Sequence, residues 1–455
     1  MKTAANRWRT TIGDALRTEL WPVPAIAVVA AVALGVVMPR VDAHVDDALP
    51  PVVTAYLFNG GPEAARSVLS AVASSLVTAT SLTFSLTVVT LQLASSQFSP
   101  RLLRTFTRDR LVHLSLGVLL ATFVYALTVL RTVRASLSDQ AAFVPQLAVT
   151  IAFALTVLSV VTLVAFLAHL ARQIRVESML REVHAETLTT MRRLLTGSDG
   201  RDSTVGQRVE VPTDAALLCA PSSGFLAAVD SAALLSAAIS ADVVIHFDRL
   251  PGDSLIAGTP IAAVWRKQKD GALAEDIRAA VQDRVADAVN TKFERTPVQD
   301  VAFGLRQLVD VTSKALSPGI NDPTTAVHAL GHISALLCEA AQKDFSDELL
   351  RDKEGQVRVV LRRPEFDQLL DLGVTQPRRF GAGDPEVLSR IATLLREVAW
   401  VSTRPAHHLA ITRQVQRLSD TVDRQDFDDT ERGLLHDQLR AVRNALIGRW
   451  PVSAP

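Results

Sequence analysis

The chain is poor in the residues that build disulfide scaffolds. Only two of its 455 residues are cysteines, Cys219 and Cys338, and only two are tyrosines. Two isolated cysteines exclude a disulfide framework and a cysteine-rich zinc site, and they fit small core residues in a reducing compartment. Basic and acidic residues number 47 each, so the formal net charge is zero. This balance argues against a nucleic-acid-binding protein that relies on bulk positive charge.

Signatures of catalysis are also missing. The sequence contains no Walker loop, GxGxxG, GxSxG, kinase signature or HExxH motif. His328 and His332 lie four residues apart on a predicted helix, a spacing that could bind a metal. No neighbouring glutamate or cysteine completes a catalytic set, and surface or packing histidines explain the pair more simply. We therefore predict no enzymatic activity, no metal site and no cofactor.

Long apolar runs, by contrast, fill much of the first 170 residues. There are four of them, at 23–38, 68–94, 111–130 and 145–170. A membrane-spanning helix needs about 17–25 residues that are mostly apolar. The first run is short and could belong to a signal peptide, but no small-residue cleavage site follows it, so we interpret it as a retained helix. Residues 1–171 are thus predicted to form a transmembrane domain with four helices.

The loops between these runs predict the orientation of the chain in the membrane. Basic residues precede the first run, follow the fourth and gather between the second and third, whereas the loop after the first run is rich in aspartate. Loops rich in lysine and arginine stay on the cytoplasmic side. Both termini are therefore predicted to be cytoplasmic, together with the region of about 285 residues that follows the fourth run.

The second apolar run carries an unusual number of hydroxyl groups. At 100° per residue they fall on two opposite faces of a helix. One face holds Ser74, Thr78, Ser81, Ser85, Gln92 and Ser96, and the other holds Thr80, Thr83, Thr87 and Thr90. Serine and threonine can bond to their own helix backbone, and small residues let helices pack closely. Two opposite polar faces and a lone amide are more than helix packing requires. They favour a helix 71–94 that packs against the protein on one side and lines a water-filled path on the other.

A basic collar follows this helix and consists of Arg101, Arg104, Arg108 and Arg110. No acidic residue lies between Ser67 and Arg108, so a ring of such helices in a homo-oligomer would favour anions over cations. The alternative is that these arginines set the topology and contact lipid headgroups.

The remaining sequence predicts three further segments. Residues 172–207 read as a charged stalk helix followed by a linker rich in glycine, serine and aspartate. Residues 208–268 contain short apolar runs between turns, which is typical of a β-rich module. Residues 269–455 are mainly helical, with a possible strand in GQVRVVLRR. The fold class is therefore an α-helical membrane domain followed by a cytoplasmic α+β region.

A charged run in this last segment is a candidate site for a ligand or subunit contact. It contains Arg306, Asp310, Lys314, Asn321 and Asp322. Solvated helix faces and caps explain most of the run. In particular, Asp322 is a plausible N-cap because Pro323 follows it at the first helical turn.

Two phrases resemble signatures of one bacterial membrane-protein family, the domain of unknown function 2254. They are FSLTVVTLQLASSQFSPRLLRTFTRD, residues 84–109, and FGLRQLVDVTSKALSPGINDPTTAVHAL, residues 303–330. The resemblance implies a bacterial inner-membrane protein with the same two-part layout, and it implies no activity. The family usually has a run like RTxEQDPxFGLRQ, from which this chain departs between Glu294 and Asp300, so no role is assigned to Gln299.

Two functional hypotheses remain open. The first is a homo-oligomeric channel or passive transporter for a small ion, with helix 71–94 lining the path through the lipid bilayer. The second is a membrane-anchored sensor or scaffold without a conduit, whose cytoplasmic region binds a ligand or partner. Nucleic acid is not an expected partner.

Overall fold

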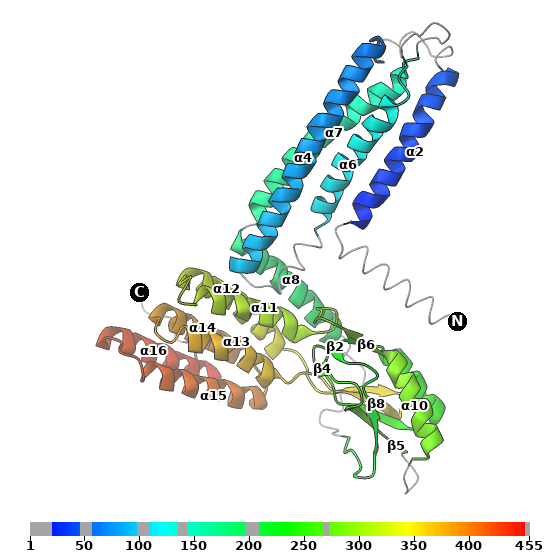
Figure 1. The fold of residues 1–455 in the computed structure, drawn as a ribbon. Coiled ribbons are helices and arrows are strands. Elements are labelled where there is room, and N and C mark those ends of the chain that lie inside the picture. The colour runs from blue at the N-terminus through cyan, green and yellow to red at the C-terminus, as the bar shows by residue number, and fades with distance from the viewer. Residues whose placement is uncertain are drawn as a thin grey trace. The chain divides into compact units, whose positions relative to one another are not determined.

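The computed structural model describes residues 21–45, 57–97, 109–134, 143–173, 175–195, 209–266 and 273–450. The chain divides into two compact units, Met1–Ser178 and Met179–Pro455, which we call the N-terminal and C-terminal units. Figure 1 shows the elements of both. Each unit is described here by itself.

The described residues of the N-terminal unit form four long helices that correspond to the four predicted apolar runs. They are α2 (Pro22–Val45), α4 (Pro62–Gln97), α6 (Arg110–Leu130) and α7 (Gln146–Gln173). All four are long and apolar enough to cross a membrane. The first helix is longer than its predicted run, because it continues beyond Met38 through Pro39 into a polar turn. The prediction of four apolar helices near the N-terminus is confirmed.

Helix α6 is the centre of this unit and contacts the other three helices. In the most apolar 18-residue stretch of α6, 56% of the residues are buried, compared with 17–28% in the corresponding stretches of α2, α4 and α7. Leu119, Tyr125 and Val129 of α6 are fully or almost fully buried in the shared core. The hydroxyl of Tyr125 donates to the carbonyl of Ala148 at 3.1 Å, so its polar end is satisfied inside the bundle.

A buried carboxylate joins α2 to the start of α7. Asp42 is 3% exposed, and its two oxygens accept from the backbone amides of Leu147 and Ala148 at 2.9 Å each. These amides belong to the first turn of α7, where backbone N–H groups have no partner within the helix. Asp42 therefore acts as a cap supplied by another helix, which explains a charged side chain inside an apolar unit.

Among its described residues, the C-terminal unit has two small sheets. The larger has the order β1-β5-β3-β8-β7, with β3 and β8 parallel and all other neighbours antiparallel. The smaller is antiparallel, with the order β4-β2-β6. The strands are β1 (Ala216–Cys219), β2 (Gly224–Val229), β3 (Val244–Phe247), β4 (Ser254–Leu255), β5 (Pro260–Trp265), β6 (Val289–Lys292), β7 (Glu348–Arg351) and β8 (Val357–Leu361).

The larger sheet reaches beyond the predicted β-rich module of residues 208–268. Strand β8 pairs with β3 although more than a hundred residues separate them, and the predicted strand in GQVRVVLRR is β8 itself. Two helices, α9 (Ser231–Ala241) and α10 (Glu275–Ala288), share one apolar core with the strands. A boundary drawn at residue 268 therefore cuts this core, because local composition carries no sign of a strand that returns from far along the chain.

Six further helices form two parallel columns. One column consists of α11 (Val301–Ala315), α13 (Phe366–Phe380) and α15 (Pro405–Val422). The other consists of α12 (Pro323–Ala341), α14 (Pro385–Val401) and α16 (Asp429–Leu446). Neighbours contact one another within each column and between the columns, as Figure 1 shows. Asp300, Asp322, Asp384 and Asp428 cap four of these helices with their side chains, so the predicted cap at Asp322 is confirmed.

The predicted stalk and linker, residues 172–207, are divided in the structure. Helix α7 ends at Gln173, and α8 (Val176–Leu195) belongs from Met179 onward to the C-terminal unit. Thr187 of α8 lies so close to Gly304 of α11 that a Cβ on that glycine would be 1.7 Å from the threonine hydroxyl. Described residues of α8 thus pack on α11, and the linker at 196–207 lies outside the described residues.

Candidate functional site

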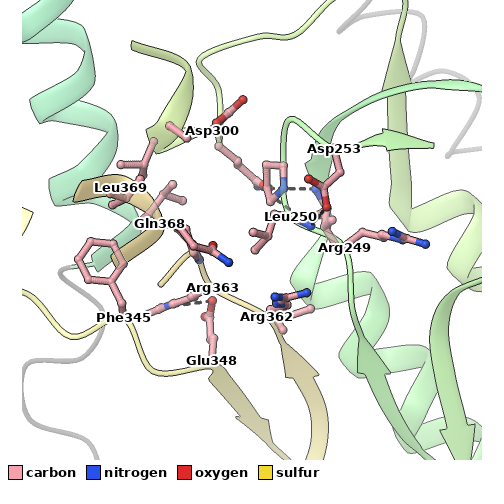
Figure 2. Close-up of a pocket in the computed structure, with 18 of the residues that line it drawn as sticks. Arg249, Leu250, Asp253, Asp300, Phe345, Glu348, Arg362, Arg363, Gln368 and Leu369 are labelled. Atoms are coloured by element: carbon pink, nitrogen blue, oxygen red, sulfur yellow. Dashed lines mark hydrogen bonds and ion pairs between the residues drawn. The ribbon is translucent and has the colours of Figure 1, made fainter. Parts of the chain in front are cut away.

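A pocket of about 450 Å³ lies entirely within the C-terminal unit (Figure 2). Its walls come from the last turn of α8, the loop between β3 and β4, the first turn of α11, and the segment that joins β8 to α13. The start of α11 and the start of α13 both border it, and helix N-termini favour anions because their backbone N–H groups carry partial positive charge. This pocket is the strongest candidate for a binding site in the described structure.

Positive charge dominates the pocket. Six arginines and three carboxylates line it, which leaves an excess of three positive charges. The arginines are Arg193, Arg249, Arg295, Arg306, Arg362 and Arg363, and the carboxylates are Asp253, Asp300 and Glu348. Arginine presents several N–H donors in a planar fork that matches carboxylate and phosphate groups. The charge balance therefore suits an anionic ligand.

One ion pair, Arg295–Asp300, forms a rigid part of the wall. The Nε and Nη2 atoms of Arg295 donate to Oδ2 of Asp300 at 2.9 and 2.6 Å. Only 2% of the Asp300 side chain is exposed, and its Oδ1 accepts from the backbone amide of Phe303. Burial raises the pKa of Asp300, while Arg295 opposes that shift. Asp300 is thus a buried cap of α11 that depends on its arginine partner.

The other arginines are held in place by contacts of their own. Arg363 pairs with Glu348 at 3.3 Å, and Arg362 pairs with Asp248 at 3.2 Å. Arg249 donates to the carbonyl of Pro260 at 2.9 Å, and Arg193 donates to the carbonyl of Val298. Figure 2 shows Arg249 on one segment and Arg362 and Arg363 together on another. Their contacts reduce the conformational entropy that a ligand would have to remove.

Apolar side chains supply most of the remaining lining, together with Ser231, Gln299 and Gln368. Phe247 and Phe345 are 1% and 8% exposed, and Leu369 is 2% exposed. Figure 2 shows Phe345 and Leu369 on the side of the pocket opposite Arg249. A mostly apolar wall with a few placed polar groups is typical of pockets that bind small organic molecules. The two kinds of lining together suit an organic anion with an apolar body.

Gly252 in the β3–β4 loop permits a close approach to the ion pair. Its φ angle is +96°, and a Cβ added there would lie 2.1 Å from Oδ2 of Asp300. The amide of Gly252 donates to the carbonyl of Leu226 at 2.7 Å, which fixes the loop to β2. Only glycine fits this position without moving the Arg295–Asp300 pair.

Gln299 has a structural role that the sequence did not predict. Its Oε1 accepts from the amide of Val229 at 2.9 Å, and its Nε2 donates to the carbonyl of Val229 at 3.2 Å. These bonds hold the end of β2 beside the start of α11. Gln299 also lines the pocket.

The predicted ligand or subunit residues are not brought together in this pocket. Of the five, only Arg306 lines it, where it also donates to Gln376 at 3.2 Å. Asn321 adopts a left-handed conformation with φ +50° in the connection between α11 and α12. Asp322 caps α12, and Thr325 bonds to it, so its pKa is lowered. The SPGIN turn is thus a helix connector.

The remaining pocket arginines were missed in the sequence because they come from four separate segments. A signal was present in LRRPEF, where two arginines end a strand just before a helix start. In the structure that strand is β8, and the helix is α13 with a capping box at Glu365. Charged residues between a strand end and a helix start are a reasonable sign of a site, but their partners could not be identified from the sequence.

The two hydroxyl faces of α4 differ in the structure. Thr83, Thr87 and Thr90 are buried against the other helices, and each bonds to the carbonyl four residues earlier at 2.8 Å. On the opposite face Ser74, Thr78, Ser81, Ser85 and Gln92 are exposed. This exposed polar stripe is flanked by apolar side chains that are also exposed, including Phe84 on one flank and Leu82 on the other.

Two predicted features near the end of α4 fall partly outside the described structure. The side chain of Ser96 is not described, and Arg101, Arg104 and Arg108 of the basic collar lie outside the described residues. Arg110 is the exposed first residue of α6. Next to it, Asp109 caps α6 and pairs with His169 of α7 at 2.5 Å.

Comparison with known proteins defines the family. The model of the domain of unknown function 2254 (DUF2254), described as a predicted membrane protein, matches residues 17–397. The chain belongs to this family. The match covers the four apolar helices and the whole arginine-lined pocket, and it ends within α14.

Relatives of this DUF2254 protein occur in mycobacteria. It is 34% identical over 428 residues to the uncharacterized protein Rv1290c of Mycobacterium tuberculosis strain H37Rv and to the uncharacterized protein Mb1321c of Mycobacterium bovis. Each alignment covers 94% of this chain and 80% of the relative. No solved structure matches the chain.

Proposed function

We propose that this protein is a membrane-anchored sensor whose C-terminal unit binds a small organic anion in the arginine-lined pocket. The observation that carries the proposal is the combination of six arginines and an apolar wall around a space of about 450 Å³. A volume of that order lies in the usual range for small-molecule sites, about 300–1,000 Å³. The excess of three positive charges favours a ligand with at least two negative charges, such as an aromatic or aliphatic phosphate.

Calorimetric titration of the full-length protein in detergent tests this proposal. The probe is 1-naphthyl phosphate, which combines an apolar ring with a doubly charged phosphate. The expected result is saturable binding that weakens at least tenfold in Arg362→Gln, because this arginine lines the pocket but is half-exposed and does not support the buried Asp300. Salt should also weaken binding, since charge attraction is screened.

The matched control is Arg440→Gln. Arg440 lies on α16 and pairs with Asp437 on the same helix, so the variant removes an identical charge outside the pocket. Its affinity for 1-naphthyl phosphate should equal that of the wild type. Equal losses in Arg362→Gln and Arg440→Gln, or no saturable binding by the wild type, would contradict a ligand site in this pocket.

A second candidate function is a homo-oligomeric conduit lined by α4. It is favoured by the exposed polar stripe of Ser74, Thr78, Ser81, Ser85 and Gln92, since the amide of Gln92 would find no water in lipid. Copies of α4 around an axis would give these groups water or one another, and the collar arginines would favour anions over cations. Chloride flux into liposomes is the measurement, and Ser81→Leu with Ser85→Leu should abolish it.

The proposal includes the orientation of the protein in the membrane. The distribution of basic residues in the loops supports a bacterial inner-membrane location with both termini in the cytoplasm. The C-terminal unit would then meet cytoplasmic metabolites. Labelling of a single cysteine introduced at Arg440, in intact cells and after permeabilisation, distinguishes the two sides. The expected result is labelling only after permeabilisation, in a background that lacks the native cysteines.

A further inference from the structure

A second group of arginines lies in a groove between α13 and α15, apart from the pocket described above. The groove has a volume of about 630 Å³ and is lined by Arg378, Arg379, Arg417 and Arg424. The first two belong to the last turn of α13, Arg417 belongs to α15, and Arg424 follows its end. None of these four arginines lines the first pocket.

The carboxylates of the groove do not balance its arginines. Its lining contains two aspartates, Asp371 and Asp420, so four positive charges face two negative ones. Asp371 is already engaged by Arg417 at 2.7 Å and by the hydroxyl of Thr375 at 2.9 Å. Asp420 accepts from Gln416 at 2.8 Å. An excess of two positive charges therefore remains in the groove.

In this cluster, the guanidinium group of Arg378 is only partly hydrogen-bonded. Its Nη1 donates to the hydroxyl of Thr421 at 2.5 Å, but its Nε is buried and has no hydrogen-bond partner among the described residues. Burial lowers the pKa of Arg378, and the nearby Arg379, Arg417 and Arg424 lower it further. Like charges this close repel one another, and a bound anion would relieve that repulsion.

We propose that the groove between α13 and α15 is a second anion site that binds a hydrophilic, phosphate-bearing ligand with two or more negative charges. Ala382 is the only apolar residue of its described lining, so an apolar ligand body would find no complementary surface. The same lining contains no aromatic ring, which argues against stacked nucleic-acid bases. The ligand chemistry thus differs from that of the first pocket.

Only part of this groove lies within the stretch that the family model matches. Arg417 and Arg424 lie beyond residue 397, where the DUF2254 match ends, whereas Arg378 and Arg379 lie within it. Half of the arginines therefore come from the C-terminal part of this chain, which the family model does not match.

Calorimetric titration of the full-length protein in detergent with inorganic pyrophosphate tests the site. Saturable binding is expected, with an affinity at least tenfold lower in Arg379→Gln and in Arg424→Gln. Both side chains belong to exposed residues, so these variants should fold, which a matched melting curve checks. Arg440→Gln removes the same charge from α16 and should bind pyrophosphate like the wild type.

Two further measurements complete the test. One distinguishes a lipid headgroup from a free phosphate compound, and the other distinguishes binding in this groove from binding in the first pocket. If the natural ligand is a lipid headgroup, nanodiscs that contain phosphatidylglycerol should weaken pyrophosphate binding relative to phosphatidylcholine nanodiscs. Equal affinities in the two would identify a free phosphate compound. Arg362→Gln should leave pyrophosphate binding unchanged, so failure at the first pocket and failure here are distinguishable. Absence of pyrophosphate binding, or binding unaffected by both Arg379→Gln and Arg424→Gln, would overturn the proposal.

Discussion

The arginine-lined pocket and the exposed polar stripe of α4 both gather polar groups, but they do so in different ways. In the pocket, several arginines contact a group from a distant segment, as Arg193 does with the carbonyl of Val298 and Arg362 with Asp248. On α4, a hydroxyl such as that of Thr78 bonds to the carbonyl of Ser74 in its own helix. Charges that depend on distant partners are costly to leave alone, whereas hydroxyls that bond locally are not.

The largest effect is expected when the buried ion pair of the pocket is broken. Arg295→Met should destabilise the protein by about 3–5 kcal/mol, because it leaves Asp300 buried without its counter-charge. Thermal or urea unfolding followed by tryptophan fluorescence measures the change. Arg440→Met, which breaks a pair on the surface of one helix, should melt close to the wild type.

The same variant should show a defined pH dependence. The pKa of Asp300 is already raised in the folded protein and should rise further without Arg295. In the unfolded chain the carboxyl loses its proton near its ordinary pKa of about 3.9, so stability falls as pH rises above that value. The deficit of Arg295→Met should therefore be smaller at pH 5 than at pH 8, and an equal deficit at both would contradict this account of Asp300.

A smaller effect is expected from Gly252→Ala. The new methyl group would collide with Asp300, and the backbone at φ +96° disfavours any side chain, so we expect a loss of about 1–3 kcal/mol. Gly258→Ala is the matched control, because Gly258 also has a positive φ of +81° but faces open space. If the melting temperature falls more in Gly252→Ala than in Gly258→Ala, the difference measures the collision with Asp300 apart from the backbone strain that both variants share. Equal losses would mean that the contact with the ion pair does not matter.

A half-exposed pair should contribute less than the buried one. Asp344 accepts from Arg404 at 2.9 Å and from the hydroxyl of Ser346 at 2.7 Å, and these bonds lower its pKa. Since 43% of the Arg404 side chain is exposed, Asp344→Asn should cost only about 1 kcal/mol at pH 7. A lowered pKa stabilises the folded state fully above the unfolded value of about 3.9, and this contribution is lost only as pH falls towards the lower pKa of the folded protein. The deficit should therefore shrink progressively below pH 4, and urea unfolding at pH 7 and at pH 2 checks that it is smaller at the lower pH.

The smallest effect on folding is expected at the exposed stripe. Ser85→Leu places an apolar side chain on an exposed helix face, so the melting temperature of the single chain should hardly change. Thr87→Leu on the buried face is the matched comparison and should destabilise by about 1–3 kcal/mol through overpacking. If Ser85→Leu instead disrupts an oligomer seen by cross-linking in membranes, the stripe is a subunit contact or lines a path. If both variants destabilise the single chain equally, the two faces are not different.

The sequence predicted the membrane unit better than the site. Apolar runs of sufficient length identify α2, α4, α6 and α7, because a helix must satisfy its backbone within itself at that depth. The two hydroxyl faces of α4 could also be predicted from the sequence, since a period of 3.6 residues assigns each side chain to one face of a helix. The sequence could not predict which of the two faces is buried, because that depends on the position of α6 and α7.

For the pocket, residue spacing was misleading. The run from Arg306 to Asp322 suggested one site, yet Asp322 caps α12 and Asn321 turns the chain between two helices. The residues that do meet come from α8, the β3–β4 loop, the start of α11 and the end of β8. No local pattern relates these segments; the β3–β4 loop and the end of β8, for example, lie together because β3 pairs in parallel with β8.

The sequence by itself thus determined four apolar helices, the two hydroxyl faces of α4 and the cap of α12 at Asp322, because each depends on neighbours a few residues away. The tertiary structure alone decided that the threonine face is buried and that six arginines surround one pocket. Burial and charge pairing are properties of segments far apart in the chain, and they exist only once packing has brought those segments together.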